Sequence, residues 1–118
     1  MLLDMSVPRP TLPAGPGAQA CCAPSTGLDP ALDAERIATV AKALAEPLRV
    51  NIVDVLRRHG DPICQCELRP LFGIKQPLLS HHISKLVAAG LVSVERRHKW
   101  AYYAVPPAAL KELSAWLS

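Results

Sequence analysis

No run of 18 apolar residues occurs in this 118-residue sequence, so the chain lacks a candidate membrane-spanning helix. Its first four residues, Met-Leu-Leu-Asp, form neither a basic region nor a long apolar stretch, so we expect no secretory signal. These two absences predict a soluble, cytoplasmic protein without a membrane partner. The length has room for one domain, and half of the residues are apolar, which is enough for a modest core.

The sequence also lacks the cysteine motifs of thiol enzymes. It contains no C-x-x-C, and no cysteine is followed six residues later by the arginine of a phosphate-cradling loop. We therefore expect no enzyme and no catalytic residues. The chain has instead two close pairs of cysteines, Cys21-Cys22 and Cys64-x-Cys66. In a reducing cytosol such pairs are more often metal ligands or redox centres than structural disulfides.

Residues 1–30 differ in composition from the rest of the chain. They hold half of the twelve prolines and few large apolar residues. Such a stretch buries too little apolar surface to offset the entropy of ordering, so we expect a flexible N-terminal arm that carries Cys21 and Cys22. Residues 31–118 are expected to form one folded domain.

The clearest pattern in the chain is a helix-turn-helix over residues 64–90. A short first helix is expected over residues 64–72, bent or tightened by Pro70, and Gly73 suits the positive-φ turn that follows it. The second helix is expected over about 76–89, with Gln76 as its entry residue and Pro77 at its first position. One apolar stripe of this helix faces the core: Leu79, Ile83, Leu86 and Val87.

The flanking segments complete a fold that is mainly α with a small β-hairpin. Helices are expected from Asp33, as an N-cap, and from Pro47 to Gly60. Residues 91–96 and 100–105 are rich in β-branched and aromatic side chains and predict a hairpin, or wing, with a basic tip. In it, Trp100 and at least one tyrosine are expected to fill the core. A last helix aligns four apolar residues, and we expect the first and last helices to form a homodimer interface: Leu110, Leu113, Trp116 and Leu117.

Between residues 69 and 103 six basic residues face one acidic residue, so the helix-turn-helix and wing form the basic face of the chain. This charge distribution on a helix-turn-helix predicts binding to double-stranded DNA, so residues 31–118 are expected to form a winged helix-turn-helix DNA-binding and dimerisation domain. His82 is expected either to pack against its neighbours or to touch DNA. The candidate DNA contacts lie at the second helix and at the wing: Lys75, Gln76, Ser80, His81, Ser84, Lys85, Arg96, Arg97 and Lys99.

Taken in this order, these pieces resemble the ArsR family of winged helix-turn-helix metal-sensing repressors. The resemblance covers most of residues 35–105 and rests on four stretches of sequence. These stretches are Ala43-Leu44-Ala45-Glu46-Pro47-Leu48-Arg49, Ile63-Cys64-Gln65-Cys66-Glu67-Leu68, the run from Gln76 to Leu86, and Glu95-Arg96-Arg97 with Trp100-Ala101-Tyr102-Tyr103. It implies a homodimer that occupies an operator and leaves it when a metal or metalloid binds. The arsenic-sensing members of this family commonly carry Cys-x-Cys-x-x-Cys on the third helix.

In this chain Cys64 and Cys66 match the first two cysteines of that motif, but Arg69 stands at the third position. A third thiolate must then come from Cys21 or Cys22, as in family members that combine an arm of one subunit with the third helix of the other. Arsenite, or antimonite, takes three thiolates and is the expected inducer. Two alternatives stay open: cadmium, lead or zinc held by all four cysteines, and a redox switch in which Cys64 or Cys66 pairs with the arm. Residues 107–118 lack His, Cys and Asp, so no zinc site is expected on the last helix.

Overall fold

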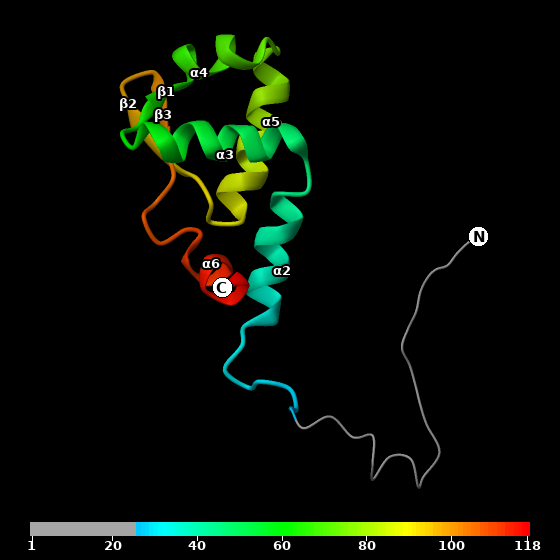
Figure 1. The fold of residues 1–118 in the computed structure, drawn as a ribbon. Coiled ribbons are helices and arrows are strands. Elements are labelled where there is room, and N and C mark those ends of the chain that lie inside the picture. Colours follow the sequence, from blue (N-terminus) through cyan, green and yellow to red (C-terminus); the bar gives the residue numbers. More distant parts are fainter. Residues whose placement is uncertain (1–25) are drawn as a thin grey trace, which may run out of the picture. The chain divides into compact units, whose positions relative to one another are not determined.

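The computed structural model describes residues 26–118. The chain divides into two units, Met1–Leu32 and Asp33–Ser118. In the second unit the elements follow one another as α2, α3, β1, α4, α5, β2, β3 and α6, with one antiparallel sheet (Figure 1). The predicted class, mainly helical with a small sheet, is confirmed. Within residues 26–118, no helix is long and apolar enough to cross a membrane.

The boundaries of the first two helices agree with the capping, proline and glycine residues in the sequence. Helix α2 (Ala34–Ala43) is capped by Asp33, whose carboxylate accepts a hydrogen bond from the Arg36 amide at 3.0 Å. Helix α3 (Pro47–His59) begins on a proline, where the missing N–H costs nothing. It ends at Gly60, which has a φ of 87°.

The start of the third helix corrects the sequence prediction, which placed Cys64 inside the helix. Ile63–Cys64 instead form the short strand β1, and helix α4 spans Gln65–Phe72. Cys64 is the N-cap of α4, because its Sγ accepts a hydrogen bond from the Cys66 amide at 3.3 Å. The strand lies beside β3 (Trp100–Ala104), so the sheet has three strands in the order β1-β3-β2.

The turn of the helix-turn-helix follows the prediction closely. Gly73 ends α4 in the left-handed region, with a φ of 61°. Helix α5 (Gln76–Ala88) is the predicted recognition helix, but its N-cap is Lys75, so Pro77 is its second residue rather than its first. Pro70 lies inside α4, a helix of only 8 residues.

The core lies between α3, α4, α5 and the sheet. Its largest fully buried side chains come from these elements and from the loop after α5: Ile52, Leu56, Leu68, Leu79, Leu86 and Leu91. Helix α3 crosses α5 in Figure 1. Tyr103 fills the core as expected, but the prediction for Trp100 is wrong. This ring is 42% exposed at the start of β3, with the Lys99 ammonium 5.3 Å from its centroid.

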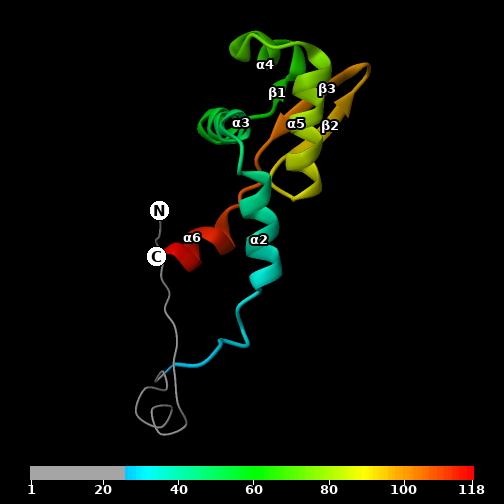
Figure 2. The ribbon, with the colours of Figure 1, turned by 90° about the vertical axis from the view of Figure 1, so that its right-hand side faces the viewer.

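Helices α2 and α6 (Lys111–Leu117) contact each other at the end of α5 remote from α4 (Figures 1 and 2). The wing strand β2 (Ser93–Arg97) is the edge of the sheet remote from β1, and the central strand β3 contacts α3 and α4. The side chains of Trp116 and Leu117 on α6 are 55% and 69% exposed. These two residues at the C-terminal end of the apolar stripe therefore have no cover within this unit of the single chain, whereas Leu110 and Leu113 are half-buried against the core.

Candidate metal centre and nucleic-acid interface

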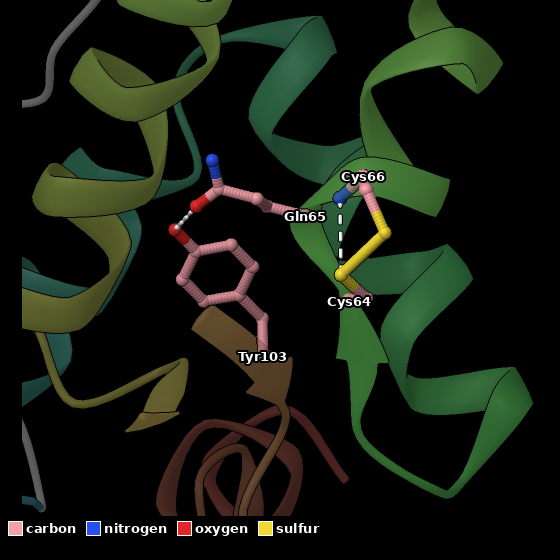
Figure 3. The surroundings of a disulfide bond; sticks show 4 residues. All are labelled: Cys64, Gln65, Cys66 and Tyr103. Atoms are coloured by element: carbon pink, nitrogen blue, oxygen red, sulfur yellow. Dashed lines mark hydrogen bonds between the residues drawn. A yellow bond between two sulfur atoms is a disulfide. The ribbon is translucent and has the colours of Figure 1, made fainter. Parts of the chain in front are cut away.

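The two cysteines of the Cys64-x-Cys66 motif lie at the junction of β1 and α4, and their sulfurs meet on one side of the turn (Figure 3). The structure joins them as a disulfide, with their Cα atoms 5.2 Å apart. The Cys64 side chain is buried, whereas Cys66 is exposed. Reduction of this bond gives two thiols at one turn of the chain, and thiolates are the donors that soft, thiophilic ions prefer.

The other two predicted ligands, Cys21 and Cys22, lie outside the described residues. Within residues 26–118, no group of three or more His, Cys, Asp or Glu side chains is arranged to hold a metal ion. The described part of the chain therefore supplies two sulfurs, and a three-sulfur site needs a ligand from residues 1–25 or from another chain. Pairing of Cys64 or Cys66 with the arm likewise involves residues beyond the described part.

Two local features of α4 act on the turn that carries the cysteines. The sulfurs lie at the N-terminus of α4, where the helix dipole favours a negatively charged thiolate. In addition, Pro70 has no N–H to donate to the carbonyl four residues earlier, which is that of Cys66. The first turn of α4 is thus held by fewer hydrogen bonds than an ordinary helix of its length.

Gln65, between the two cysteines, connects them to the sheet. Its Oε1 accepts a hydrogen bond from the Tyr103 hydroxyl at 3.3 Å. The Gln65 side chain points away from the sulfurs and toward β3 (Figure 3). Burial raises the pKa of the Tyr103 hydroxyl and Arg96 opposes this shift, so the group is a protonated donor at neutral pH.

The predicted DNA contacts on α5 form a mostly exposed surface. Lys75, Ser80, His81, Ser84 and Lys85 are all exposed, and Gln76 is half-buried. The Gln76 amide donates to Ser80 Oγ at 2.8 Å, and Ser84 Oγ donates to the His81 carbonyl at 2.8 Å. Each of these bonds lies on the exposed face of the helix and orients the polar group that donates it.

The structure brings the recognition helix and the wing together around an open cleft of about 430 Å³. Ser80 and Ser84 line it from α5, and Arg96 lines it from β2. Tyr103 and Ile83 lie among the remaining lining residues. Three of the predicted DNA contacts therefore share one concave surface.

The three basic side chains predicted to contact DNA from the wing differ in their ion-pair partners. Arg97 is engaged by Glu95, with Nε–Oε2 and Nη2–Oε1 distances of 3.1 Å, and Arg97 lowers the pKa of the Glu95 carboxyl. Neither Arg96 nor Lys99 has a carboxylate partner within 4.0 Å among residues 26–118. The turn between the strands contains His98 with a φ of 58°.

Two arginines that position α5 were not predicted. Arg36 on α2 donates to the Ala89 carbonyl, just past the end of α5, at 2.7 Å, and to Glu112 on α6 at 3.3 Å. Arg49 on α3 donates from Nε to Nδ1 of the buried His82 at 3.2 Å. His82 therefore packs against its neighbours, one of the two outcomes expected for it. No local pattern in the sequence indicated these contacts, because the partners are 53 and 33 residues away in the chain.

The comparisons with known proteins agree with this arrangement. The family model described as bacterial regulatory protein, arsR family, matches residues 46–94. The transcriptional repressor SdpR of Bacillus subtilis is 30% identical over 78 residues, which are 66% of this chain and 84% of SdpR. The chain belongs to the ArsR family. The arsenic resistance transcriptional regulator ArsR1 of Pseudomonas putida is 32% identical over 78 residues, which are 66% of this chain and 57% of that protein.

Among solved structures, a homodimeric winged helix-turn-helix DNA-binding domain from Mycobacterium bovis is similar, with a TM-score of 0.60 and 25% identity. The similarity covers 70% of this chain and 75% of that domain. By their printed names, these relatives are regulators, a repressor and a DNA-binding domain, which agrees with the expectation that this ArsR-family chain is not an enzyme. The match spans little more than half the length of the arsenic regulator.

Proposed function

We propose that this ArsR-family chain is a cytoplasmic transcriptional repressor that binds double-stranded operator DNA as a homodimer and dissociates when cysteine thiolates bind arsenite. Cys64 and Cys66 supply two of the three thiolates, and Cys21 or Cys22 supplies the third. Antimonite, which shares the three-thiolate preference, is expected to act in the same way.

One observation carries this proposal: the two sulfurs meet at the N-terminus of α4, the first helix of the helix-turn-helix. A ligand that draws Cys64 and Cys66 toward a third thiol moves the point where strand β1 and helix α4 meet, and both elements adjoin the DNA-reading surface. A coupling of about 1–3 kcal/mol between two sites changes affinity roughly 5–150-fold, which is sufficient for a genetic switch. The relative named as an arsenic resistance regulator supports arsenite as the ligand.

The proposed DNA contacts come from the exposed face of α5 and from the wing. We assign base edges to Gln76 and Ser80, which are joined by a hydrogen bond, and further contacts to His81 and Ser84 on the same helix. Backbone phosphates are assigned to the basic residues at the two ends of this surface: Lys75, Lys85, Arg96, Arg97 and Lys99.

The homodimer is supported by the uncovered apolar surface of the last helix. An open groove of about 560 Å³ is lined by Leu44 of the segment after α2, by Val50 of α3, and by Leu113 and Leu117 of α6. Exposed apolar surface of this kind commonly marks a protein interface. The similar homodimeric domain from Mycobacterium bovis supports the same assembly. A second copy of this chain is therefore the proposed occupant, through the first and last helices and the part of α3 that lines this groove.

A redox-sensing repressor is the second candidate, favoured by the disulfide that joins Cys64 to Cys66. In that case oxidation, rather than ligand binding, changes the turn at the head of α4. A sensor of cadmium, lead or zinc is the third, and it uses all four cysteines.

The deciding experiment is an anisotropy titration of the reduced full-length chain against its own promoter DNA. It is repeated with arsenite, with cadmium, and after mild oxidation by peroxide. We expect arsenite to weaken DNA binding by roughly 5–150-fold in the wild type. The Cys21→Ser/Cys22→Ser variant is expected to stay bound in the presence of arsenite. Release by cadmium alone would favour the four-cysteine site, and release only after oxidation would favour the redox sensor.

The Glu95–Arg97 pair leads to a prediction about DNA affinity. Replacing Glu95 with glutamine removes a carboxylate that repels phosphate and occupies Arg97. Because an exposed ion pair is worth about 0.2–1 kcal/mol, we expect operator binding to tighten by up to about 5-fold. The measurement is anisotropy at several salt concentrations, where a steeper salt dependence is expected. Asp61→Asn, which removes one negative charge from the exposed turn before β1, is the control, and equal effects of the two variants would contradict this role of Glu95.

A further inference from the structure

The turn that carries the two cysteines is joined to the wing at adjacent points. Strand β1 pairs with β3 so that Cys64 lies opposite Tyr102 and Ile63 lies opposite Tyr103. One residue after Cys64, the Gln65 amide oxygen accepts the hydrogen bond from the Tyr103 hydroxyl. Since Gln65 is the only residue between the two cysteines, a rotation of the backbone between the sulfurs must also move this amide (Figure 3).

Tyr103 connects this turn to the DNA-binding surface. Its side chain is 6% exposed and lines the cleft between α5 and the wing, together with Ser84 and Arg96. Strand β3 lies at the centre of the sheet and pairs with β2 along its whole length. A displacement of Tyr103 therefore changes how β2 and its basic residues lie relative to α5.

The other connection from the cysteines to α5 runs along α4 and through the turn at Gly73. A glycine in the left-handed region is a position where backbone rotation meets little steric resistance. Such a turn absorbs a small movement of α4, whereas the paired strands of a sheet transmit it. The connection through the sheet is thus the stiffer of the two.

We infer that Gln65 and Tyr103 are positioning residues that carry a change at the Cys64–Cys66 pair to the wing. Ligand binding or disulfide formation then weakens DNA binding by moving the wing relative to α5, so that the two elements no longer fit the DNA together. This inference rests on the proposed DNA-binding repressor, but it holds for either stimulus, arsenite or oxidation.

The test measures how far a change in the cysteine pair weakens operator binding. The quantity is the operator dissociation constant of the changed form divided by that of the reduced, ligand-free form. In the first arm, the full-length chain is reduced with a phosphine and compared with and without arsenite. In the second arm, the Cys21→Ser/Cys22→Ser background leaves Cys64 and Cys66 as the only thiols. There the dithiol is compared with the disulfide made by diamide, whose azo group takes up the two electrons and two protons that the thiols release.

Tyr103→Phe removes one hydroxyl and keeps the ring, so we expect operator binding of the reduced, ligand-free chain to stay within about 2-fold of wild type. In Tyr103→Phe, the ratio of the operator dissociation constants with and without the stimulus is expected to be at least about 5-fold smaller than in wild type. The wild-type ratio is expected in the usual range of roughly 5–150-fold. Arsenite affinity, followed by the ultraviolet absorption of arsenic bound to sulfur, is expected to be unchanged. That readout separates lost transmission from lost ligand binding.

Tyr102→Phe is the matched control, because it removes the same group from the neighbouring strand position that faces Cys64, and its ratio is expected to equal wild type. Gln65→Leu should lower the ratio as Tyr103→Phe does, and the double variant should lower it no further, since both changes remove one interaction.

An unchanged ratio in Tyr103→Phe, or equal losses in Tyr102→Phe and Tyr103→Phe, would overturn the inference. If arsenite has no effect on the wild type, the proposed inducer is wrong, while the oxidation arm still tests Gln65 and Tyr103. If neither stimulus changes the wild-type affinity, no coupling exists for these residues to carry and the inference fails with it.

Discussion

Replacing Leu68 with alanine is expected to lower the free energy of unfolding by about 2.7–5 kcal/mol. Leu68 is fully buried, and it is the one buried side chain of α4, a helix of 8 residues interrupted by Pro70. The cavity left by alanine removes the main contact that holds this helix against the core. In a domain of this size such a loss lowers the melting temperature by roughly 10–30 °C, which thermal unfolding followed by circular dichroism measures at fixed protein concentration.

Leu71 on the same helix provides the matched control for this prediction. Its side chain is 64% exposed, so Leu71→Ala removes the same atoms from a position that faces water. The change in unfolding free energy is expected to stay within about 0.5 kcal/mol. Similar destabilisation by the two variants would show that α4 packs through a different face from the one seen in the structure.

The elements that could be predicted from the sequence are those fixed by local signals. Asp33 caps α2 because its carboxylate reaches an amide three residues away, and Gly60 and Gly73 end their helices because a positive φ suits glycine. These causes act within a few residues of each other. A single sequence therefore suffices to read them, and the helix boundaries came out within one or two residues.

The parts that were missed depend on residues distant in the sequence. Strand β1 has only two residues, Ile63 and Cys64, and is defined by its pairing with β3 some 40 residues later, so no periodicity reveals it. The bond between Gln65 and Tyr103 spans 38 residues. Trp100 was expected in the core because it is a large aromatic side chain. It is instead the first residue of β3, beside the exposed turn, and its side chain is exposed.

The candidate site divides in the same way. The motif Cys64-x-Cys66 could be identified by spacing, because two cysteines so close in sequence are necessarily close in space. That Cys64 is also the N-cap of α4 could not be predicted, because it depends on the strand that ends there. This second role matters for mutagenesis, since a substitution at Cys64 changes a ligand and a helix cap together.

Cys64→Ser separates these two roles, and it is expected to abolish the response to arsenite while preserving DNA binding. The serine hydroxyl keeps an acceptor for the Cys66 amide, and serine is among the best N-cap residues. The fold is therefore expected to be preserved, and the operator affinity is expected to stay within about 2-fold of wild type. A neutral hydroxyl is a poor ligand for a thiophilic ion. The expected 5–150-fold weakening of operator binding by arsenite should therefore disappear.

Two further variants complete this comparison in the same anisotropy and thermal unfolding measurements. Cys64→Ala removes the cap as well as the ligand, so it is expected to lose the response and also up to about 1 kcal/mol of stability. Cys66→Ser removes a thiol that caps nothing and should lose the response alone. If Cys64→Ser is still released by the same arsenite concentration as wild type, Cys64 is not a ligand and the buried sulfur serves only the helix cap. If the Cys64→Ser variant unfolds instead, burial of the Cys64 sulfur in the core contributes more to stability than the helix cap does.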